Sequence, residues 1–487
     1  MTGVAVEQML ELWCVELRQV KAHLKPLFAH PSVATSAAAF LDGLLGPERR
    51  KTGWMRAEAA GDKGPWRQQA VLGRSHWNAD ALRDLVRESG LETLASPGAV
   101  LVIDKTGFLK QGLRLCGVGH PYTGSAGKIT NGQIGVFAAY LSDQGCTFID
   151  RQLYLPKDGT NKPERRTAAQ VPDTIRFVTK PEIAAQMIER AITAGVPFDW
   201  VATDTIYGVG SIEMQLRRAG KGYVLGAHAT DPFNSWGKTP PVAGTAEQIA
   251  RALPRQAWRR LSAGSGTKGP RLYDWAYVEL ADLEAAEYST EHTGVWTRGL
   301  LIRRSLTDHD LAFFSTWCPA GTPWDRLVRV EGRRWTIEDA FETAKTELGL
   351  THNETRSWHG WHRHVSLVML AFAMMAVVRQ CANNLASPQK RSDEAKLQRW
   401  CVGLSRKSAG SPPASRNAGS SRPSGSPGPH GDAPTRRSRK PHIANERCNR
   451  SATCVVADHC WDQVRWALEE HAWRFEPSRE LTSSGRR

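Results

Sequence analysis

The chain has 487 residues, of which 41% are hydrophobic and 23% are charged. These ordinary globular values exclude a fibrous chain and a chain disordered throughout, and the length allows about three structural units. Lysine and arginine number 64 against 49 acids, which gives a net charge of +15. This excess favours a polyanionic partner, but it does not distinguish DNA from RNA or from a membrane surface.

The nine cysteines are scattered and form no C-x-x-C pair. This pattern argues against a disulfide framework and favours a reducing compartment. Residues 1–20 carry acids inside their apolar periodicity and therefore predict an amphipathic helix rather than a signal peptide. The most apolar run, Val365–Val378, is too short to span a bilayer, so we interpret it as a buried helix and expect no membrane partner.

Residues 1–96 show helical periodicity broken by polar, glycine-containing stretches. Within Arg49–Arg67, six Lys or Arg accompany only two acids, and Trp54 and Trp66 are interleaved. Basic helices with interleaved aromatic residues are compatible with contacts to nucleic acid. We therefore expect residues 1–96 to form a helical N-terminal DNA-binding region.

Residues 97–241 change to a pattern of short apolar runs separated by Gly, Asn and Asp. The predicted elements are strands at 99–104, 132–141 and 147–156, a helix at 180–197, a strand at 198–204, a helix at 211–220 and a strand at 222–228. This order predicts a mixed sheet flanked by helices, an α/β or mixed α+β architecture.

Residues 242–325 break that alternation and predict a β-rich insertion. A basic, helix-like stretch comes first, and candidate strands follow at 271–280, 295–304 and 310–317. Residues 326–395 return to helical periodicity, with an apolar stripe inside 333–350 and a second long helix at about 358–385. We expect these helices to complete the core that residues 97–241 begin.

Residues 396–487 predict a disordered, basic, low-complexity tail. Between 403 and 440, 21 of 38 residues are Gly, Pro or Ser, and eight Lys or Arg accompany one Asp. A frameshift in a GC-rich gene would produce this composition. We therefore hypothesise that the tail is out of frame or degenerate, which the alternative reading frame would test.

Two aspartates end apolar runs of the predicted sheet. Asp104 follows AVLVI and precedes Lys105, Thr106 and Gly107, and Asp204 ends FDWVATD. Either aspartate could instead make an Asx turn at the end of a strand. If the two strands are parallel neighbours, however, both carboxylates reach the same edge of the sheet.

A third carboxylate, Glu338, lies in the predicted helix 333–350. Arg334 precedes it by four residues and Lys345 follows it by seven, which places all three side chains on one helix face. The alternative is a solvated ladder of charges on a surface helix. An arginine beside the carboxylate would hold it ionised, and the lysine could reach a phosphate.

Three carboxylates from two strand ends and one helix match the ligands that two Mg²⁺ ions require, and Mn²⁺ could replace Mg²⁺. Two such ions serve phosphodiester chemistry: one activates the attacking oxygen and the other stabilises the leaving oxygen. Asp104, Asp204 and Glu338 are therefore the candidate metal ligands.

From about residue 10 to 385, the sequence resembles the DDE transposases of bacterial insertion sequences. The segments that carry the resemblance are 100–112, 122–145, 151–160, 200–208, 269–278 and 333–350. Asp104, Asp204 and Glu338 match the family's two aspartates and its glutamate. The subgroup pattern Y-x2-R-x3-E-x6-K is met at Arg334, Glu338 and Lys345, whereas Glu331 stands at the tyrosine position.

The resemblance implies an RNase H-like core with a β-rich insertion between Asp204 and Glu338. It also implies a Mg²⁺-dependent enzyme that nicks double-stranded DNA at terminal inverted repeats and joins the freed 3′-hydroxyl to target DNA. A homodimer or larger synaptic assembly is implied, working in the bacterial cytoplasm on the nucleoid. The alternatives are a decayed copy that binds the element ends as a repressor, and a metal-dependent nuclease without strand transfer.

Basic residues around this site are candidates for contact with the DNA backbone. Within the predicted insertion, the segment 251–271 contains six Lys or Arg and no acid. The candidates are Arg251, Arg255, Arg259, Arg260, Lys268 and Arg271, together with Lys128 in a glycine-bearing loop. The alternative is an ordinary solvated basic face.

Overall fold

The computed structural model describes residues 3–386, except for residues 113, 124–126, 161 and 267–268. The predicted tail, residues 396–487, lies outside the described residues, and so does the candidate Lys268.

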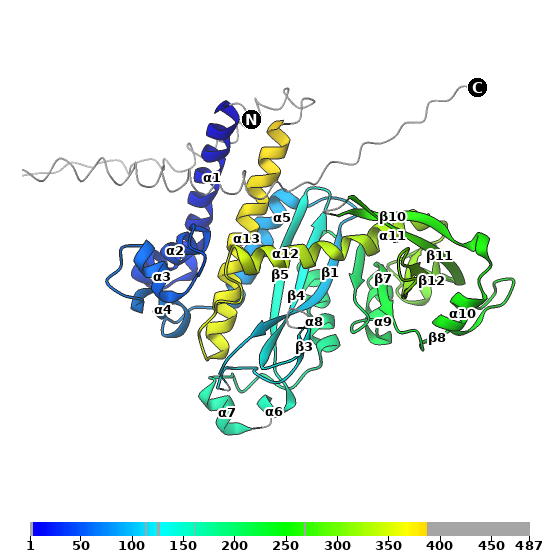
Figure 1. The fold of residues 1–487 in the computed structure, drawn as a ribbon, viewed down its shortest axis with the longest axis horizontal. Helices are drawn as coiled ribbons and strands as arrows, with labels where there is room; N and C mark the ends of the chain where they lie inside the picture. The colour runs from blue at the N-terminus through cyan, green and yellow to red at the C-terminus, as the bar shows by residue number, and fades with distance from the viewer. Residues whose placement is uncertain (1–2, 113, 124–126, 161, 267–268, 387–487) are drawn as a thin grey trace, which may run out of the picture. The chain divides into compact units, whose positions relative to one another are not determined.

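A mixed sheet of nine strands forms the centre of the fold, in the order β10-β11-β12-β13-β7-β6-β1-β4-β5 (Figure 1). Its first five strands in the sequence are β1 (Val100–Leu109), β4 (Gly132–Ser142), β5 (Gly145–Tyr154), β6 (Trp200–Thr203) and β7 (Gly222–Ala227). Strands β1, β4 and β5 form an antiparallel meander, and β6 and β7 run parallel to β1. This order confirms the predicted mixed sheet and the RNase H-like arrangement that the resemblance implied.

The β-rich segment extends this same sheet. Its strands are β10 (Arg259–Gly266), β11 (Gly269–Glu284), β12 (Val295–Arg304) and β13 (Leu311–Pro319), and all four pair antiparallel. Strand β13 also pairs with β7, from Phe313 opposite Ala227 to Trp317 opposite Tyr223. The stretch expected to be basic and helical is therefore largely strand, because only α10 (Ala246–Ala252) and a short turn, η3 (Arg255–Ala257), precede β10.

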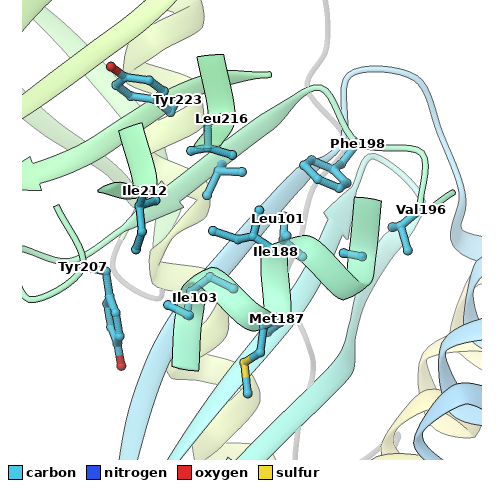
Figure 2. Packing of buried hydrophobic residues seen from close by; sticks show 14 of the residues in the cluster. Leu101, Ile103, Met187, Ile188, Val196, Phe198, Tyr207, Ile212, Leu216 and Tyr223 are labelled. Carbon is cyan, nitrogen blue, oxygen red and sulfur yellow. The ribbon is translucent and has the colours of Figure 1, made fainter. Parts of the chain in front are cut away.

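Helices α8 (Lys180–Thr193) and α9 (Gly210–Arg218) cover one face of the sheet. Thr179 and Glu182 form a reciprocal capping box that begins α8. Figure 2 shows Met187 and Ile188 of α8 packed with Leu101 and Ile103 of β1, all of them buried. The amphipathic pattern of the sequence therefore fixes which face of α8 meets the sheet.

The opposite face carries helices α11 (Trp324–Arg333), α12 (Trp335–Thr346) and α13 (Trp358–Ala386). An aromatic cluster joins α12 and α13 to β4 and β5: Phe148 contacts Phe137, Phe341 and Phe372 with ring centroids 5.0 to 5.5 Å apart. Helix α13 is long and apolar enough to cross a bilayer, but 72% of its most apolar window is buried inside the protein. Its apolar character therefore reflects its place in the core, as the sequence predicted.

The N-terminal residues are helical, as predicted: α1 (Gly3–Leu24), η1 (Lys25–Leu27), α2 (Pro31–Leu45), α3 (Gly53–Ala59), α4 (Trp66–Gly73) and α5 (Ala79–Leu94). Trp54 and Trp66 are both exposed on these helices. The remaining short elements are β2 (Tyr122–Thr123), β3 (Lys128–Ile129), α6 (Lys157–Thr160), α7 (Pro163–Ala168), β8 (Pro232–Asn234), β9 (Ala243–Thr245) and η4 (Ala285–Glu287).

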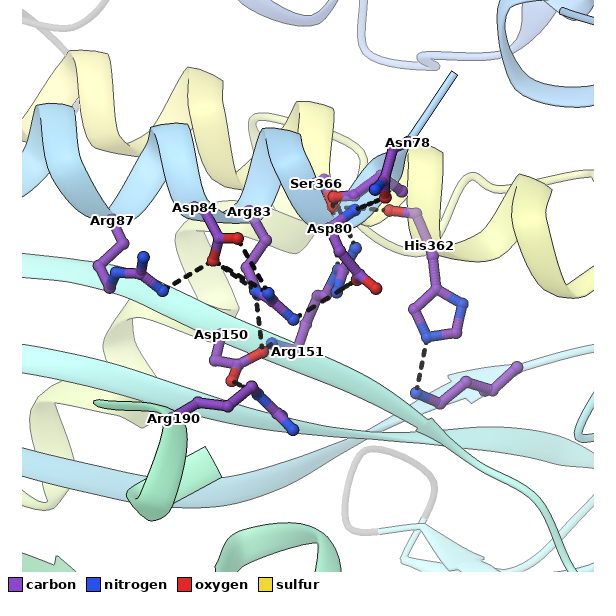
Figure 3. A network of polar contacts seen from close by, with 12 residues as sticks. Asn78, Asp80, Arg83, Asp84, Arg87, Asp150, Arg151, Arg190, His362 and Ser366 are labelled. Atoms are coloured by element: carbon purple, nitrogen blue, oxygen red, sulfur yellow. Dashed lines mark hydrogen bonds and ion pairs between the residues drawn. The ribbon is translucent and has the colours of Figure 1, made fainter. Parts of the chain in front are cut away.

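A buried polar network ties α5 to the sheet and to α13 (Figure 3). The fully buried guanidinium of Arg151 on β5 donates to Asp80 Oδ1 at 2.8 Å and to Ser366 Oγ at 2.9 Å. On the neighbouring residue of β5, Asp150 accepts a hydrogen bond from Arg190 of α8 at 2.8 Å. Because buried charges need partners, this network fixes α5 and α13 relative to the strand that carries Arg151.

Candidate active site

The first two candidate carboxylates lie side by side. Strands β1 and β6 are parallel neighbours, and their register places Ile103 opposite Thr203, so Asp104 and Asp204 occupy the next positions. Strand β1 continues to Leu109, so Asp104 does not end its strand as the sequence suggested. What ends there is the pairing with β6, and this opens the sheet beside Asp104.

The loop after Asp204 passes close against β7. A Cβ atom on Gly208 would lie 1.8 Å from the carbonyl oxygen of Gly226, and one on Gly226 would lie 2.5 Å from the amide nitrogen of Thr205. Only glycine fits at both places, and the amide of Ile206 donates to Asp204 Oδ1 at 2.9 Å. Asp204 is therefore held by a tight turn rather than by a free loop.

Arg334 links Glu338 to Asp104. Its Nη1 atom lies 3.1 Å from Glu338 Oε1 and 3.8 Å from Asp104 Oδ2. Arg334 and Glu338 are four residues apart on consecutive turns where α11 meets α12, as the sequence spacing predicted. The structure thus brings a helix carboxylate and a strand carboxylate to one guanidinium.

Lys345 lies in the last turn of α12. Burial lowers its pKa, and the nearby Glu342 opposes that shift. In the part of the chain that the structure describes, no ion pair joins Lys345 to Asp104, Asp204 or Glu338. Its predicted phosphate contact stays a prediction.

Two neighbours of the aspartates were not among the candidate residues. Lys105 Nζ lies 2.9 Å from Asp204 Oδ2, and the backbone amide of Lys105 donates to Asp104 Oδ1 at 2.7 Å. Tyr207 is fully buried, and its hydroxyl has no hydrogen-bond partner among the described residues. Burial raises its pKa first, and Asp104 and Asp204 raise it further. The sequence signal for both was their position, one and three residues after an aspartate.

The environment of Asp104 favours a cation beside it. Burial, followed by the charge of Asp204, raises the pKa of Asp104 from its ordinary value of 3.8 to about 6. Hydrogen bonding by Lys105 and the charge of Arg334 only partly oppose this rise. Two adjacent carboxylates, one of them the buried Asp104 with its raised pKa, are a donor set that suits a divalent ion, because the ion relieves their repulsion.

No metal-binding group of three or more His, Cys, Asp or Glu side chains is formed among the described residues. Instead, cationic side chains link the acids: Lys105 neutralises Asp204, and Arg334 lies between Asp104 and Glu338. The carboxylate oxygens are donors that suit divalent ions. The ammonium of Lys105 and the guanidinium of Arg334 supply positive charge next to these carboxylates.

The raised pKa of Asp104 gives a stability prediction. The folded protein binds a proton on Asp104 more tightly than the unfolded chain, so the carboxylate destabilises the fold as pH rises from about 4 to about 6, and the full cost persists above that. Asp104→Asn should therefore raise the free energy of unfolding by on the order of 2 kcal/mol at about pH 8 and change it little at about pH 4.

Denaturant unfolding at the two pH values measures this effect. Mg²⁺ should raise the Tm of the native protein and leave that of the variant nearly unchanged. Equal stability of variant and native protein at both pH values would show that Asp104 carries no electrostatic strain.

Glu331 is a charged residue of helix α11, and its side chain is buried. It is 1% exposed, its Oε1 accepts from Arg303 Nη1 at 2.8 Å, and its Oε2 has no hydrogen-bond partner among the described residues. Burial raises its pKa, and the charges of Arg303, Arg334 and Arg271 oppose that rise. Glu331 therefore ties α11 to Arg303 of β12 by a buried ion pair, and the charges of Arg271 and Arg334 act on it as well.

The candidate DNA contacts have different environments. Arg251, Arg255, Arg259, Arg260 and Lys128 are exposed. Arg259 and Arg260 lie on β10, where Arg259 stacks over the ring of Trp324 at 4.1 Å and Arg260 pairs with Asp274 at 3.1 Å. Arg271 instead donates to the carbonyl oxygens of Ala263 and Gly332, so its guanidinium holds β10 against α11.

Replacing Arg259 and Arg260 by Gln should weaken binding to any duplex and reduce the slope of log affinity against log salt by about two. The reason is that each phosphate contact releases a condensed counterion. Fluorescence anisotropy with a labelled duplex across a salt series measures the slope. Arg218→Gln, which removes an exposed charge on α9, is the control. An unchanged slope in the double variant would place β10 outside the interface.

Comparisons with known proteins identify the family of the chain. A family model described as DDE superfamily endonuclease matches residues 23–270, slightly more than half of the chain and including Asp104 and Asp204. Over 138 residues, the chain is 34% identical to a probable transposase for insertion sequence element IS701 from Microchaete diplosiphon. That match covers 28% of this chain and 33% of the relative, so the chain spans about a third of the relative's length.

A solved structure, the NurA nuclease from Sulfolobus solfataricus, aligns over 69% of this chain and 94% of its own at 9% identity, with a TM-score of 0.23. That likeness is too weak to carry an argument. The adjacent aspartates of β1 and of the loop after β6, and the family match over more than half of the residues, lead to one conclusion: the chain belongs to the DDE superfamily endonucleases.

Proposed function

We propose that this protein is a DNA transposase that cleaves the ends of its insertion sequence and joins the 3′-hydroxyl to target DNA. The observation that supports the proposal is that one guanidinium contacts Glu338 and Asp104, while Asp204 follows the strand next to that of Asp104. Asp104 and Asp204 follow paired positions of parallel strands, and Arg334 links Asp104 to Glu338. Phosphodiester cleavage by two metal ions needs oxygen ligands gathered in this way.

In this proposal Asp104, Asp204 and Glu338 hold two Mg²⁺ ions, or Mn²⁺ in their place. The ions would activate the attacking oxygen and stabilise the leaving oxygen. Arg334 orients Glu338 through an ion pair in which Nη1 lies 3.1 Å from Oε1. Lys105 holds Asp204 in place, and Lys345 is assigned to a phosphate of the bound DNA.

The partners follow from the same proposal. Double-stranded DNA binds as terminal inverted repeats and as target, held by the helical region 1–96 and by exposed arginines of the insertion 242–325. In this proposal the core consists of residues 97–241 and 326–395, of which 387–395 lie outside the described residues. The enzyme works on the nucleoid in the bacterial cytoplasm, and two or more copies assemble to bring both element ends together.

The test uses the full chain, Mg²⁺ and a linear duplex that carries the inverted repeats flanking the gene. Nicks at the repeat ends followed by joined products would support the proposal. Nicks without joined products would indicate a metal-dependent nuclease instead. Omission of Mg²⁺, or excess EDTA, should remove all products while the DNA remains bound.

One observation favours a second candidate, a DNA-binding repressor that does not cut. The ammonium of Lys105 already pairs with Asp204, and no three-acid group is formed among the described residues. A copy in which these cations are permanent partners would bind element ends without hydrolysis. Binding without any nicking in the same assay, with both Mg²⁺ and Mn²⁺, would select this candidate.

A further inference from the structure

A cavity of about 760 Å³ lies at the end of the sheet near the candidate active site. Its walls include Val118, His120, Ile134, Tyr154, Arg165 and Lys180. We call it the β4–β5 cavity, because Ile134 of β4 is paired with Tyr154 of β5. Its volume is within the range of about 300 to 1,000 Å³ that is usual for sites of small organic groups.

The sheet register places this cavity further along β1 than Asp104 and on the opposite face of the sheet, because Ile103 packs beneath α8 whereas the next side chain, Asp104, meets Arg334 on the other face. Ile134 is paired with Gly107, three residues further along β1 than Asp104. Val136 is the next residue of β4 on the same face, and it packs in the core beneath α8. The β4–β5 cavity therefore lies on the α8 face of the sheet, at the end where α8 begins with Lys180.

Lys180 connects the cavity to the aspartates. Its Nζ atom lies 5.1 Å from the centroid of the Tyr154 ring, inside the cavity wall. Burial lowers the pKa of Lys180 first, the charge of Lys105 lowers it further, and the charge of Asp204 raises it. Lys180 is thus electrostatically coupled to the Lys105–Asp204 pair on one side and touches an aromatic ring on the other.

The chemistry of the walls matches one nucleotide. Tyr154 offers a half-buried ring, held edge-on by Phe177 with centroids 6.4 Å apart, and Val118, Ile134 and Pro156 supply apolar surface. Lys180 and Arg165 supply positive charge, and no carboxylate is among the described residues that line the cavity. A ring to stack a base next to cations for its phosphate is how proteins bind a single strand.

Resting on the proposed function, we propose that the β4–β5 cavity binds a nucleotide of the DNA strand that is cut, with its base on Tyr154 and its phosphate at Lys180. The phosphate between this nucleotide and the next one then lies toward Lys105 and Asp204. The cavity would hold the strand beside the Lys105–Asp204 pair, and Lys180 and Tyr154 would be substrate-binding residues.

The test is photocrosslinking, which reports position without requiring activity. The full chain is mixed in Ca²⁺ with a duplex that has a short single-stranded thymidine extension, in which iodouracil replaces thymine. After irradiation, the crosslinked peptide is expected to contain Tyr154. Crosslinks confined to the N-terminal helices or to β10 and β11 would overturn the proposal.

Binding variants give a second measurement. Lys180→Gln and Tyr154→Leu should each weaken binding of the extended duplex about tenfold and leave binding of a blunt duplex nearly unchanged. Lys162→Gln is the matched control, because it removes an exposed charge from the same segment outside the cavity wall. Equal loss in Lys162→Gln and Lys180→Gln would show a diffuse charge effect and overturn the assignment.

The two proposals fail in different ways. Nicking by the native protein without a crosslink at Tyr154 would overturn the cavity assignment and leave the transposase proposal intact. A crosslink at Tyr154 without nicking would support the cavity and count against the transposase. Circular dichroism of each variant checks that Tyr154→Leu, which changes a strand residue, remains folded.

Discussion

Asp104→Asn, Asp204→Asn and Glu338→Gln should each reduce DNA nicking by on the order of a thousandfold or more, because each removes an anionic ligand that the proposed ions require. DNA binding should remain, since the exposed arginines that would contact the backbone lie on other elements. Nicking is measured on supercoiled or end-labelled DNA, and binding by anisotropy.

Glu342→Gln is the matched control, because Glu342 is an exposed acid on the same helix as Glu338. It should retain nearly full nicking. If any of the three active-site variants kept more than a few per cent of the native rate, that residue would be removed from the site. If all three kept it, the enzyme would use a different centre.

Glu331→Gln should destabilise the fold by on the order of 3 to 5 kcal/mol, because it breaks a buried ion pair and leaves arginine charge without a counter-ion. Glu331 is 1% exposed, and Arg303, Arg271 and Arg334 all act on it electrostatically. The free energy of unfolding from urea titration measures the loss.

A double-mutant cycle isolates the pair. Arg303→Met alone should also destabilise, and the combination Glu331→Gln with Arg303→Met should cost less than the sum of the two single changes. Glu338→Gln is the comparison, because the Glu338 side chain is 41% exposed and its loss should matter far less to stability. Strict additivity would show that the Glu331–Arg303 contact contributes nothing.

Much of the core could be predicted from local patterns. The apolar runs that form β1, β4 and β6, and the 3.6-residue stripes of α8 and α12, depend on periodicity that a single sequence displays. The Arg334–Glu338 contact was also predictable, since four residues on a helix fix the spacing. Both features depend on residues close together in the chain.

What could not be predicted depends on partners distant in the chain. Nothing near Glu331 indicates that Arg303 of β12 will bury it, and the basic residues of β10 resemble a helix until β11 pairs with them. Likewise His362 and His364 are buried near the start of α13, and their ring nitrogens meet the carbonyl oxygens of Trp358 and Gly349. Tertiary pairing decided each of these cases.

The hydrogen-bonded ladder runs without a break from the strand of Asp104, through β6, β7 and β13, to the strand of Arg259. A continuous ladder has no hinge, so the arginine-bearing edge cannot swing toward the carboxylates when DNA arrives. The sheet therefore fixes the distance between the arginines of β10 and Asp104. A duplex that touched both places would have to match this spacing, and sequences that deform easily would do so with the smallest penalty.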